Sequence, residues 1–544
     1  MIAVAGDSVE IFMPVWTPGS YLVREFARHV ECLQVEGCRV TKTRKNRWSI
    51  ETAGAREIRV SYRIYCREMS VRTNWVEESF ALLNGAATFV NLVDAPQANY
   101  EVRLDLPSNW KTSASGMGEI GPHHYQAPDY DTLVDSPIVA GNPAVYRFEV
   151  DGVPHSLVNV NEEGVWDGPR SAADAAKIVR QYREMWGSLP YRKYVFINLL
   201  MEAGGGLEHR NSVVMMASRW ATSTRRAYLG WLGLLSHEYL HVWNVKRMRP
   251  VELGPFDYER ENYTRSLWIA EGFTNYYDAL TVRRAGLSTR EEYLGESGLS
   301  GLIQALQTTP GRSVSSVEQA SFDAWIKLYR PDENTGNTSI SYYVKGAVIA
   351  WLLDVRIRTA TDGAKSLDDL MRLAFARFSG ERGFSQAEFR ATAEEIAGVP
   401  LNEFFRHAVE STEELDYGEA LDWFGLRFKK PHATGKGWIG AETKNDGGRL
   451  VVSKAPRGTP AFDSGLSVDD EILAIDGFRV RADQLGARLE NYEPGAPVSL
   501  LVARREKLLR IELSLGEEPA RVWQLEVRPS PAEVQKAHLR DWLG

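Results

Sequence analysis

The hydrophobic period changes twice along this chain, and these changes restrict most strongly what the chain can fold into. Up to about residue 150, β-branched and aromatic residues alternate with polar ones and are interrupted by Gly, Pro and Asn, which is typical of strands. Long amphipathic segments follow, and from about Gly435 to Leu515 the strand pattern returns. A chain of 544 residues is also too long for a single hydrophobic core. We therefore expect a multidomain α+β protein.

The changes of period and the polar linker around Lys429–Gly435 set the expected domain boundaries. The sequence predicts an N-terminal β-sandwich-like domain over 1–150, a mainly helical domain over 151–425, a second β-rich module over 426–518 and a weakly patterned tail over 519–544. The helices expected in the middle region are Ser171–Trp186, Arg225–Lys246, Thr264–Ala285, Tyr342–Thr359 and Ser385–Val409.

Charge and composition exclude several classes of function. Lys and Arg total 64 and Asp and Glu total 72, so a net charge of −8 argues against a nucleic-acid-binding protein and against a polybasic membrane patch. No apolar run approaches the roughly 20 residues that a membrane span needs. The first residues, Met1–Asp7, show no signal peptide, so a cytoplasmic location is expected unless a leader precedes the given start.

The clearest chemical motif is His237-Glu238-Tyr239-Leu240-His241, inside an expected helix. Two histidines four positions apart lie one turn apart on the same face, which is the reach that two ligands of one zinc ion require. Glu238 is rotated away from the two imidazoles, so it can face the remaining coordination position and take a proton from the attacking water. The motif predicts a zinc site with a general base.

A zinc site of this kind needs a third protein ligand, and Glu271 is the candidate. Its neighbours Trp268, Ile269 and Phe273 are apolar, so its helix should be buried on several sides. Because a buried carboxylate needs a partner, a divalent cation would account for this residue. Asn275, one turn later, is expected to orient a ligand histidine through its side-chain oxygen without binding the metal itself.

At this point the sequence resembles the gluzincin metallopeptidases, in which such a motif is followed by a Trp-x-x-Glu-Gly-Phe-x-x-Tyr helix, here starting at Trp268. Within these it is similar to the glycyl aminopeptidase family, whose members carry a C-terminal PDZ domain. The resemblance implies a thermolysin-like catalytic domain after the N-terminal β domain. The other segments that resemble this family are Met13–Tyr21, Asp135–Pro137, Gly205–His209 and Tyr343–Ala347.

The resemblance also implies a role for each site residue. His237, His241 and Glu271 would bind one Zn²⁺, and Glu238 would act as general base and then as proton donor. Tyr343 would donate a hydrogen bond from its hydroxyl to the tetrahedral intermediate, although from the sequence alone it can equally be a core aromatic residue. Glu208 would hold the free α-amino group of the substrate, although without the resemblance such a residue is more often a solvated loop acid. The flexible residues Gly205 and Gly206 would let the backbone approach the peptide closely.

The segment Ala461–Leu466, followed by Asp470–Gly477, resembles a PDZ domain, and Gly437–Gly440 is the expected carboxylate-binding loop. PDZ domains add an extended peptide to a strand and hold its C-terminal carboxylate with backbone N–H groups. A purely structural appendage on the peptidase is the alternative.

Three functions are compatible with these features. The first is an aminopeptidase that removes small N-terminal residues, Gly or Ala, from peptides with a free N-terminus; the substrate preference follows from the resemblance. The second is a zinc endopeptidase. The third is a PDZ-bearing binding or scaffold protein with a vestigial metal site, against which stands the presence of a chemically competent residue at every expected catalytic position.

Overall fold

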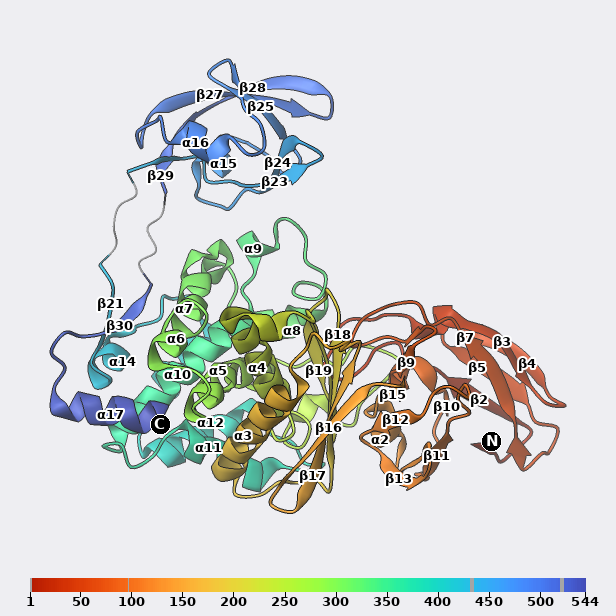
Figure 1. The fold of residues 1–544 in the computed structure, drawn as a ribbon. Helices are drawn as coiled ribbons and strands as arrows, with labels where there is room; N and C mark the ends of the chain where they lie inside the picture. The colour runs from red at the N-terminus through yellow and green to blue at the C-terminus, as the bar shows by residue number, and fades with distance from the viewer. Residues whose placement is uncertain (1, 96, 431–434, 519–522) are drawn as a thin grey trace. The chain divides into compact units, whose positions relative to one another are not determined.

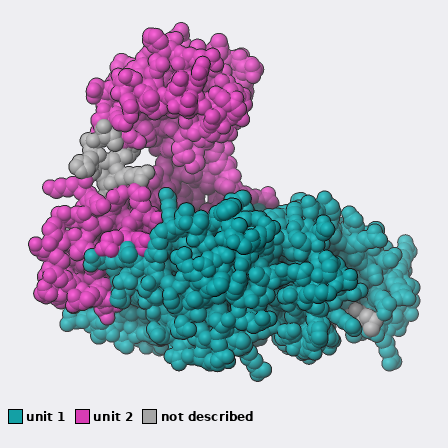
Figure 2. Space-filling model, in the orientation of Figure 1, with its two compact units in different colours: residues 1–290, 360–399, 543–544 teal, residues 291–359, 400–542 magenta. Residues whose placement is uncertain are grey.

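The computed structural model describes the whole chain except residues 1, 96, 431–434 and 519–522. It divides into two compact units (Figure 2). Unit 1 comprises residues 1–290, 360–399 and 543–544, and unit 2 comprises residues 291–359 and 400–542. Within the described residues, no helix has the length and apolar character needed to cross a bilayer.

Unit 1 begins with small antiparallel sheets, as the alternating pattern predicts. The largest have the strand orders β10-β2-β5-β4 and β12-β15-β9-β8. The strands of this region are β1 (Ile2–Ala3), β2 (Ser8–Phe12), β3 (Val30–Val35), β4 (Arg39–Arg44), β5 (Arg47–Glu51), β6 (Glu57–Ile58), β7 (Val60–Ile64), β8 (Trp75–Val76), β9 (Phe80–Leu83), β10 (Asn91–Leu92), β11 (Tyr100–Arg103), β12 (Thr112–Ser115), β13 (Gly118–Gly121), β14 (His124–Ala127) and β15 (Ile138–Gly141), with short helices α1 (Gly85–Thr88) and α2 (Tyr130–Val134).

A five-stranded mixed sheet follows, with the order β16-β17-β18-β20-β19. Its strands are β16 (Ala144–Val150), β17 (Val153–Val160), β18 (Tyr194–Leu200), β19 (Gly205–Glu208) and β20 (Ser212–Ala217). One face packs against the β12-β15-β9-β8 sheet, called the β8–β15 sheet below, through a shared apolar core that includes Val71, Ile197 and Leu207. Helices cover the other face (Figure 1). β18 is buried along its whole length, as expected for a central strand.

The helices of unit 1 that matter for the site are α3, α4 and α5. Their observed bounds, with those of the other helices of this unit, are α3 (Gly168–Trp186), α4 (Arg225–Leu240), the π-helical turn η4 (Trp268–Gly272), α5 (Phe273–Arg284), α11 (Leu367–Phe378) and α12 (Gln386–Ala397). The expected helix Arg225–Lys246 begins where predicted but ends at Leu240, six residues earlier than expected. The expected helix Thr264–Ala285 is wrong in detail, because its first turn is π-helical and begins only at Trp268. α4 packs on β19 and β20 and along α5.

Unit 2 contains a helical part and a β-rich module. The helices are α6 (Arg290–Leu294), α7 (Leu299–Thr308), α8 (Val317–Phe322), α9 (Thr335–Thr338), α10 (Tyr342–Ala360), α13 (Asn402–Phe405), α14 (Gly418–Trp423), α15 (Pro460–Asp463), α16 (Leu485–Leu489) and α17 (Glu533–Leu543). α10 begins at the residue predicted from the sequence and ends one residue later than expected.

The β-rich module has its own core, which includes Val452, Ile475 and Leu500. Its strands are β22 (Gly437–Trp438), β23 (Glu442–Asp446), β24 (Arg449–Lys454), β25 (Glu471–Ile475), β26 (Phe478–Arg479), β27 (Pro497–Arg504), β28 (Lys507–Ser514) and β29 (Gly516–Glu517). Before and after it, β21 (Leu426–Phe428) and β30 (Leu525–Val527) pair with each other. The module is therefore inserted between two strands of the helical part.

The α+β fold class predicted from the sequence is confirmed: a β-rich N-terminal region is followed by a helical middle region and a C-terminal β-rich module. The domain boundaries at 150, 425 and 518 stay predictions. Of the expected tail over 519–544, the structure describes residues 523–544, which include β30 and α17, and Trp542 near the end of α17 is fully buried.

Candidate active site

The two histidines of the motif lie at the C-terminal end of α4. Thr224 caps the start of this helix, because its side chain accepts a hydrogen bond from the backbone N–H of Ala227. The helix then runs without interruption from Arg225 to Leu240. The ring centroids of His237 and His241 are 5.0 Å apart with nearly perpendicular planes. The side chain of His241 is only 1% exposed. Both imidazoles therefore point to one place, as the helical spacing predicts.

Glu271 reaches the same place from the π-helical turn η4. Its Oε2 lies 3.2 Å from Nε2 of His241 and 3.5 Å from Nε2 of His237. π-turns inside helices are rare and occur often at functional sites, because the wider turn changes the direction of a side chain. The side chain of Glu271 is buried, and burial alone would raise its pKa; the two imidazoles outweigh burial and lower the pKa to about 2.

Two groups outside this cluster orient the histidines. Oδ2 of Asp278, on α5, lies 3.5 Å from Nδ1 of His237, and the backbone carbonyl oxygen of Asn244 lies 2.8 Å from Nδ1 of His241. The side-chain amide of Asn244 also donates to the carbonyl oxygens of Ile269 and Ala270, beside Glu271. Asn244 thus ties the end of α4 to the turn that carries Glu271. The role predicted for Asn275 stays a prediction.

The donor set of His237, His241 and Glu271 fits a zinc ion. Ligand atoms of the three residues lie within 4.8 Å of one another. Two imidazole nitrogens and one carboxylate oxygen form a common protein donor set for zinc that leaves a coordination position for water or substrate. Among the described residues, one further group of this kind, Glu208, Glu238 and His241, shares His241 with the first. Both groups belong to one site.

Glu238 faces this site from the same helix as the histidines. Its side chain is buried, with 6% of the residue exposed. Burial raises the pKa of Glu238 to about 7; the two imidazoles of His237 and His241 oppose the shift, and the charges of Glu208 and Glu271 reinforce it. A carboxylate poised near neutral pH can both accept and return a proton.

Strand β19 lies directly over Glu238. A Cβ atom built on Gly206 would stand 2.0 Å from Oε1 of Glu238, so any side chain there would have to displace the Glu238 carboxylate. Gly205 has φ of +127°, a backbone conformation that residues with a side chain rarely adopt. Gly206 therefore allows β19 to approach α4 closely, and the predicted role of both glycines in peptide binding stays a prediction.

Glu208, two residues further along β19, is a buried acid. It is 3% exposed, which excludes the solvated loop acid considered from the sequence. Its Oε1 has no hydrogen-bond partner in the described structure and lies 3.9 Å from Nζ of Lys246. A Cβ built on Gly19, which has φ of +89°, would stand 2.3 Å from Oε1. The segment Met13–Tyr21 of the N-terminal region thus closes over the Glu208 carboxylate.

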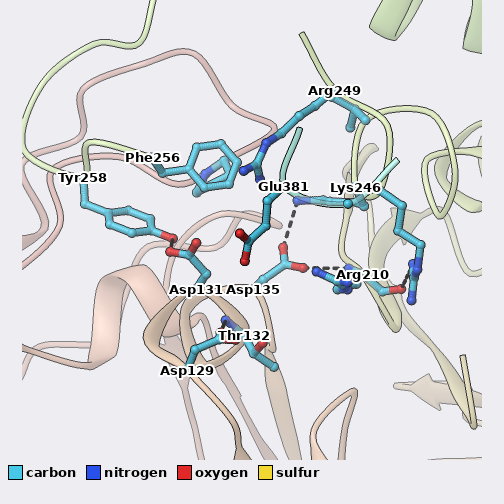
Figure 3. Close-up of a pocket in the computed structure, with 14 residues that line it drawn as sticks. Asp129, Asp131, Thr132, Asp135, Arg210, Lys246, Arg249, Phe256, Tyr258 and Glu381 are labelled. Atoms are coloured by element: carbon cyan, nitrogen blue, oxygen red, sulfur yellow. Dashed lines mark hydrogen bonds and ion pairs between the residues drawn. The ribbon is translucent and has the colours of Figure 1, made fainter. Parts of the chain in front are cut away.

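A cavity of about 250 Å³ is lined by Lys246 and Asp135, among other residues (Figure 3). Asp135 accepts hydrogen bonds from Nζ of Lys246 at 2.8 Å and from the backbone N–H of Arg210 at 2.7 Å, and lies 3.1 Å from Nδ1 of His209. Burial would raise the pKa of Asp135, but Lys246 and His209 outweigh it and hold the pKa well below its usual range. The carboxylate thus joins the N-terminal region to the residues that flank Glu208.

Sequence reasoning missed Asp278, Asn244, Lys246 and Gly19 as parts of this site. Gly19 carried a signal, because it lies in the segment Met13–Tyr21 that was singled out for its family resemblance. The other three had none: an Asp on a helix, or an Asn or a Lys just after one, is ordinary in sequence, and only packing shows what these side chains touch.

Tyr343 belongs to unit 2 and is described with it. It stands in the first turn of α10, half-buried, with its ring stacked on Tyr342 at a centroid distance of 4.9 Å. Its hydroxyl lies 3.5 Å from that of Tyr329. The predicted role of Tyr343 in catalysis stays a prediction.

The predicted carboxylate-binding loop at Gly437–Gly440 also stays a prediction. In this loop the backbone N–H of Gly437 donates a hydrogen bond to the carbonyl oxygen of Tyr492.

Comparison with protein families agrees with this geometry. Residues 2–142 match the peptidase M61 N-terminal domain, residues 230–349 match the M61 glycyl aminopeptidase domain, and residues 437–515 match a PDZ domain. The M61 match covers His237, Glu238, His241, Glu271 and Tyr343. No curated protein matches the chain in sequence.

Solved structures include one close match to the whole chain, an aminopeptidase N family protein from Idiomarina loihiensis. It shares 29% sequence identity with a TM-score of 0.93, over 100% of this chain and 96% of the other. An M1 zinc metallopeptidase from Deinococcus radiodurans matches 76% of this chain and 88% of its own at 14% identity and a TM-score of 0.47. The matched domains identify a peptidase with the M61 aminopeptidase fold.

Proposed function

The chain belongs to the M61 glycyl aminopeptidase family, and from this premise we propose that it is a zinc-dependent aminopeptidase that releases small N-terminal residues, Gly or Ala, from peptides. One observation carries the proposal: the buried Glu208 carboxylate, with one oxygen lacking a hydrogen-bond partner in the described structure, shares a cluster with Glu238 and His241. An acid in that position is suited to bind the ammonium group of a free peptide N-terminus.

His237, His241 and Glu271 would hold the zinc ion, with Asp278 and the carbonyl of Asn244 fixing the two rings. When bound, zinc supplies a Lewis acid that polarises the peptide carbonyl and lowers the pKa of water. Glu238 accepts a proton from the attacking water at its carboxylate and then returns it to the nitrogen of the departing amine.

Glu208 makes the enzyme an exopeptidase in this proposal. Its carboxylate, two residues along β19 from the glycine that covers Glu238, pairs with the substrate's α-ammonium group and so places the first peptide bond at the base. The preference for small residues rests on the family, and the close approach of Gly19 to Glu208 supports it, because the space beside the carboxylate is narrow.

Tyr343 is proposed to donate a hydrogen bond to the carbonyl oxygen as it becomes negatively charged. Its half-buried hydroxyl, at the start of α10 within the M61-matched segment, supports this assignment. Removing one such donor costs about a hundredfold or more in kcat. Tyr343→Phe should lower kcat by that factor with an unchanged thermal unfolding midpoint; an unchanged kcat would assign Tyr343 to the core instead.

The experiment that tests the proposal compares a peptide such as Gly-Ala-Ala-Ala with its N-acetylated form, using zinc-loaded protein. We expect release of free glycine from the first peptide only, and loss of this activity in Glu238→Gln with zinc retained. Equal cleavage of both peptides would make the protein an endopeptidase. Absence of bound zinc together with activity unaffected by Glu238→Gln would favour a binding or scaffold protein.

The PDZ module is proposed to bind the C-terminal segment of a peptide by strand addition. Calorimetry with a library of C-terminal hexapeptides and their amidated forms tests this, since a PDZ groove in use should bind only the free acids. Binding of neither form would favour the structural appendage considered from the sequence.

A further inference from the structure

Strand β19 forms one edge of the five-stranded sheet in the described chain. The backbone N–H of His209 donates to the carbonyl oxygen of Ser212, so this pair is of the hydrogen-bonded kind. Because the two kinds of pair alternate in an antiparallel ladder, Gly206 opposite Met215 and Glu208 opposite Val213 are non-hydrogen-bonded pairs. The peptide groups of Gly206 and Glu208 therefore point outward, to the side where an extended peptide can add.

Arg72 stands at this outward side. Its Nη2 donates a hydrogen bond of 3.3 Å to the carbonyl oxygen of Gly206. Gly206 is also the residue whose missing side chain leaves room for the Glu238 carboxylate. The Arg72 guanidinium group and the Glu238 carboxylate thus both lie next to Gly206, although Arg72 comes from the N-terminal region.

The backbone at Arg72 is held in place by its neighbours. Val71 is 1% exposed and belongs to the core between the two sheets. The Ser70 hydroxyl accepts a hydrogen bond from the backbone N–H of Arg72 at 3.1 Å and lies 2.7 Å from the Thr73 hydroxyl. A turn fixed on both sides presents the side chain at low entropic cost, as expected for a binding residue.

The positive charge of Arg72 has no acidic partner in the described structure. No carboxylate of the described residues lies within 4.0 Å of its guanidinium group, and its Nε is buried without a hydrogen-bond partner. Arg47, also from the N-terminal region and similarly shielded, pairs with both Glu10 and Glu259. A partly buried guanidinium group without an anion is costly, which indicates that an anion arrives with the ligand.

We infer that Arg72 forms a carboxylate subsite on the leaving-group side, which binds the C-terminal α-carboxylate of peptides of two or three residues. This inference rests on the proposed function. Glu208 and Gly206 are two residues apart, about 7 Å along the strand. A short peptide with its ammonium group on Glu208 therefore places its carboxylate beside Gly206, within reach of Arg72. The enzyme is then selective for short peptides with a free C-terminus.

Kinetics with Gly-Ala-Ala and its C-terminal amide test this inference. For the wild type, we expect kcat/KM for the acid to exceed that for the amide by about ten- to a hundredfold, the range of a charge-assisted hydrogen bond. In Arg72→Met this ratio should fall to about one, mainly through a higher KM for the acid, and Arg72→Lys should restore part of it. A wild-type ratio near one, or a ratio unchanged in Arg72→Met, would overturn the inference.

The matched control is Arg63→Met, which removes an exposed arginine on β7 and should leave the ratio unchanged. Calorimetry with zinc-loaded Glu238→Gln adds a test without turnover: Arg72→Met in that background should weaken binding of the acid about tenfold and leave the amide unaffected. Failure of the wild type to release glycine from either peptide would instead contradict the proposed function, and the calorimetric comparison still decides the carboxylate subsite.

Discussion

Two regions of the site are built in different ways. The floor, consisting of His237, Glu238, His241 and Glu271, comes from the end of α4 and from η4, which lie within 35 residues of each other in the sequence. The wall, consisting of Gly19, Arg72, Asp135 and the strand β19, is assembled from the N-terminal region and an edge strand. In the proposed function, the floor carries the zinc and the general base, and the wall determines which end of the peptide is bound.

The difference lies in what stabilises each region. The floor gathers two imidazoles and two acids whose charges balance once a cation is bound, and helix periodicity alone brings the histidines together. The wall contains a buried ion pair, Asp135 with Lys246, which connects segments far apart in sequence. Mutations in the floor should therefore affect turnover and metal, and mutations in the wall should affect folding and substrate choice.

The largest expected effect is the loss of activity caused by a substitution in the floor. His241→Ala removes a zinc ligand, and loss of the metal should lower kcat/KM by roughly a thousandfold or more. Metal analysis of the purified variant should show less than one zinc per chain, while its circular dichroism spectrum stays that of the wild type. Retained zinc with retained activity would contradict the assignment of the floor.

A large effect on stability is expected from the wall. Asp135→Asn leaves Lys246 buried without its acid, which should cost about 3–5 kcal/mol. Because the pKa of Asp135 is lowered in the folded state, its contribution is present at neutral pH and is lost as the pH falls below the unfolded value of about 3.8. Urea unfolding at pH 7 and pH 3 should therefore show a smaller difference between variant and wild type at the lower pH.

The control for this variant is Asp151→Asn. Asp151 forms an exposed ion pair with Arg183, and such pairs contribute roughly 0–1 kcal/mol. Equal destabilisation by the two substitutions would show that the wall does not depend on its buried pair.

Gly206→Ala affects the place where wall and floor meet. The added methyl group would overlap the Glu238 carboxylate, and displacement of the base by about 1 Å should lower kcat by roughly a hundredfold. Gly204→Ala is the matched control, because a Cβ there meets no atom within 4 Å. The two variants should differ in kcat while their thermal unfolding midpoints stay close. Similar kcat values would show that β19 yields to the methyl group.

The smallest effect is expected at Asp278, behind the floor. Asp278→Asn keeps a hydrogen-bond acceptor for His237 but removes the charge, which should weaken zinc affinity about ten- to a hundredfold. Competition with a zinc-binding dye measures this, and Asp278→Ala should weaken zinc binding further. If neither variant changed zinc affinity, His237 would be oriented by its helix alone.

The floor was largely predictable from the sequence. The spacing of His237 and His241 on a proline-free helix specifies that their side chains share a face, and the apolar neighbours of Glu271 indicated its burial. What could not be predicted locally is the π-helical turn that directs Glu271, because the sequence around Trp268 is equally compatible with a regular helix. In the folded chain, the side-chain amide of Asn244 donates hydrogen bonds to the carbonyl oxygens of Ile269 and Ala270 in that turn.

The wall was visible in the sequence only through resemblance. Glu208 reads locally as a solvated acid, and Arg72 as one of many surface arginines. Their burial and their neighbours depend on the pairing of β19 with β20 and on the packing of the β8–β15 sheet against the five-stranded sheet. Interactions between segments more than a hundred residues apart leave no local pattern to interpret.

The sequence by itself determined the periodic elements, the order of the β, helical and PDZ regions and the positions of His237, Glu238 and His241, because helix and strand geometry repeats over a few residues. The tertiary structure alone decided that Gly206 touches Glu238, that Gly19 covers Glu208 and that Arg72 reaches β19. The reason is physical: side-chain periodicity is a local property of the backbone, whereas burial and the pairing of charges depend on which distant surfaces pack together.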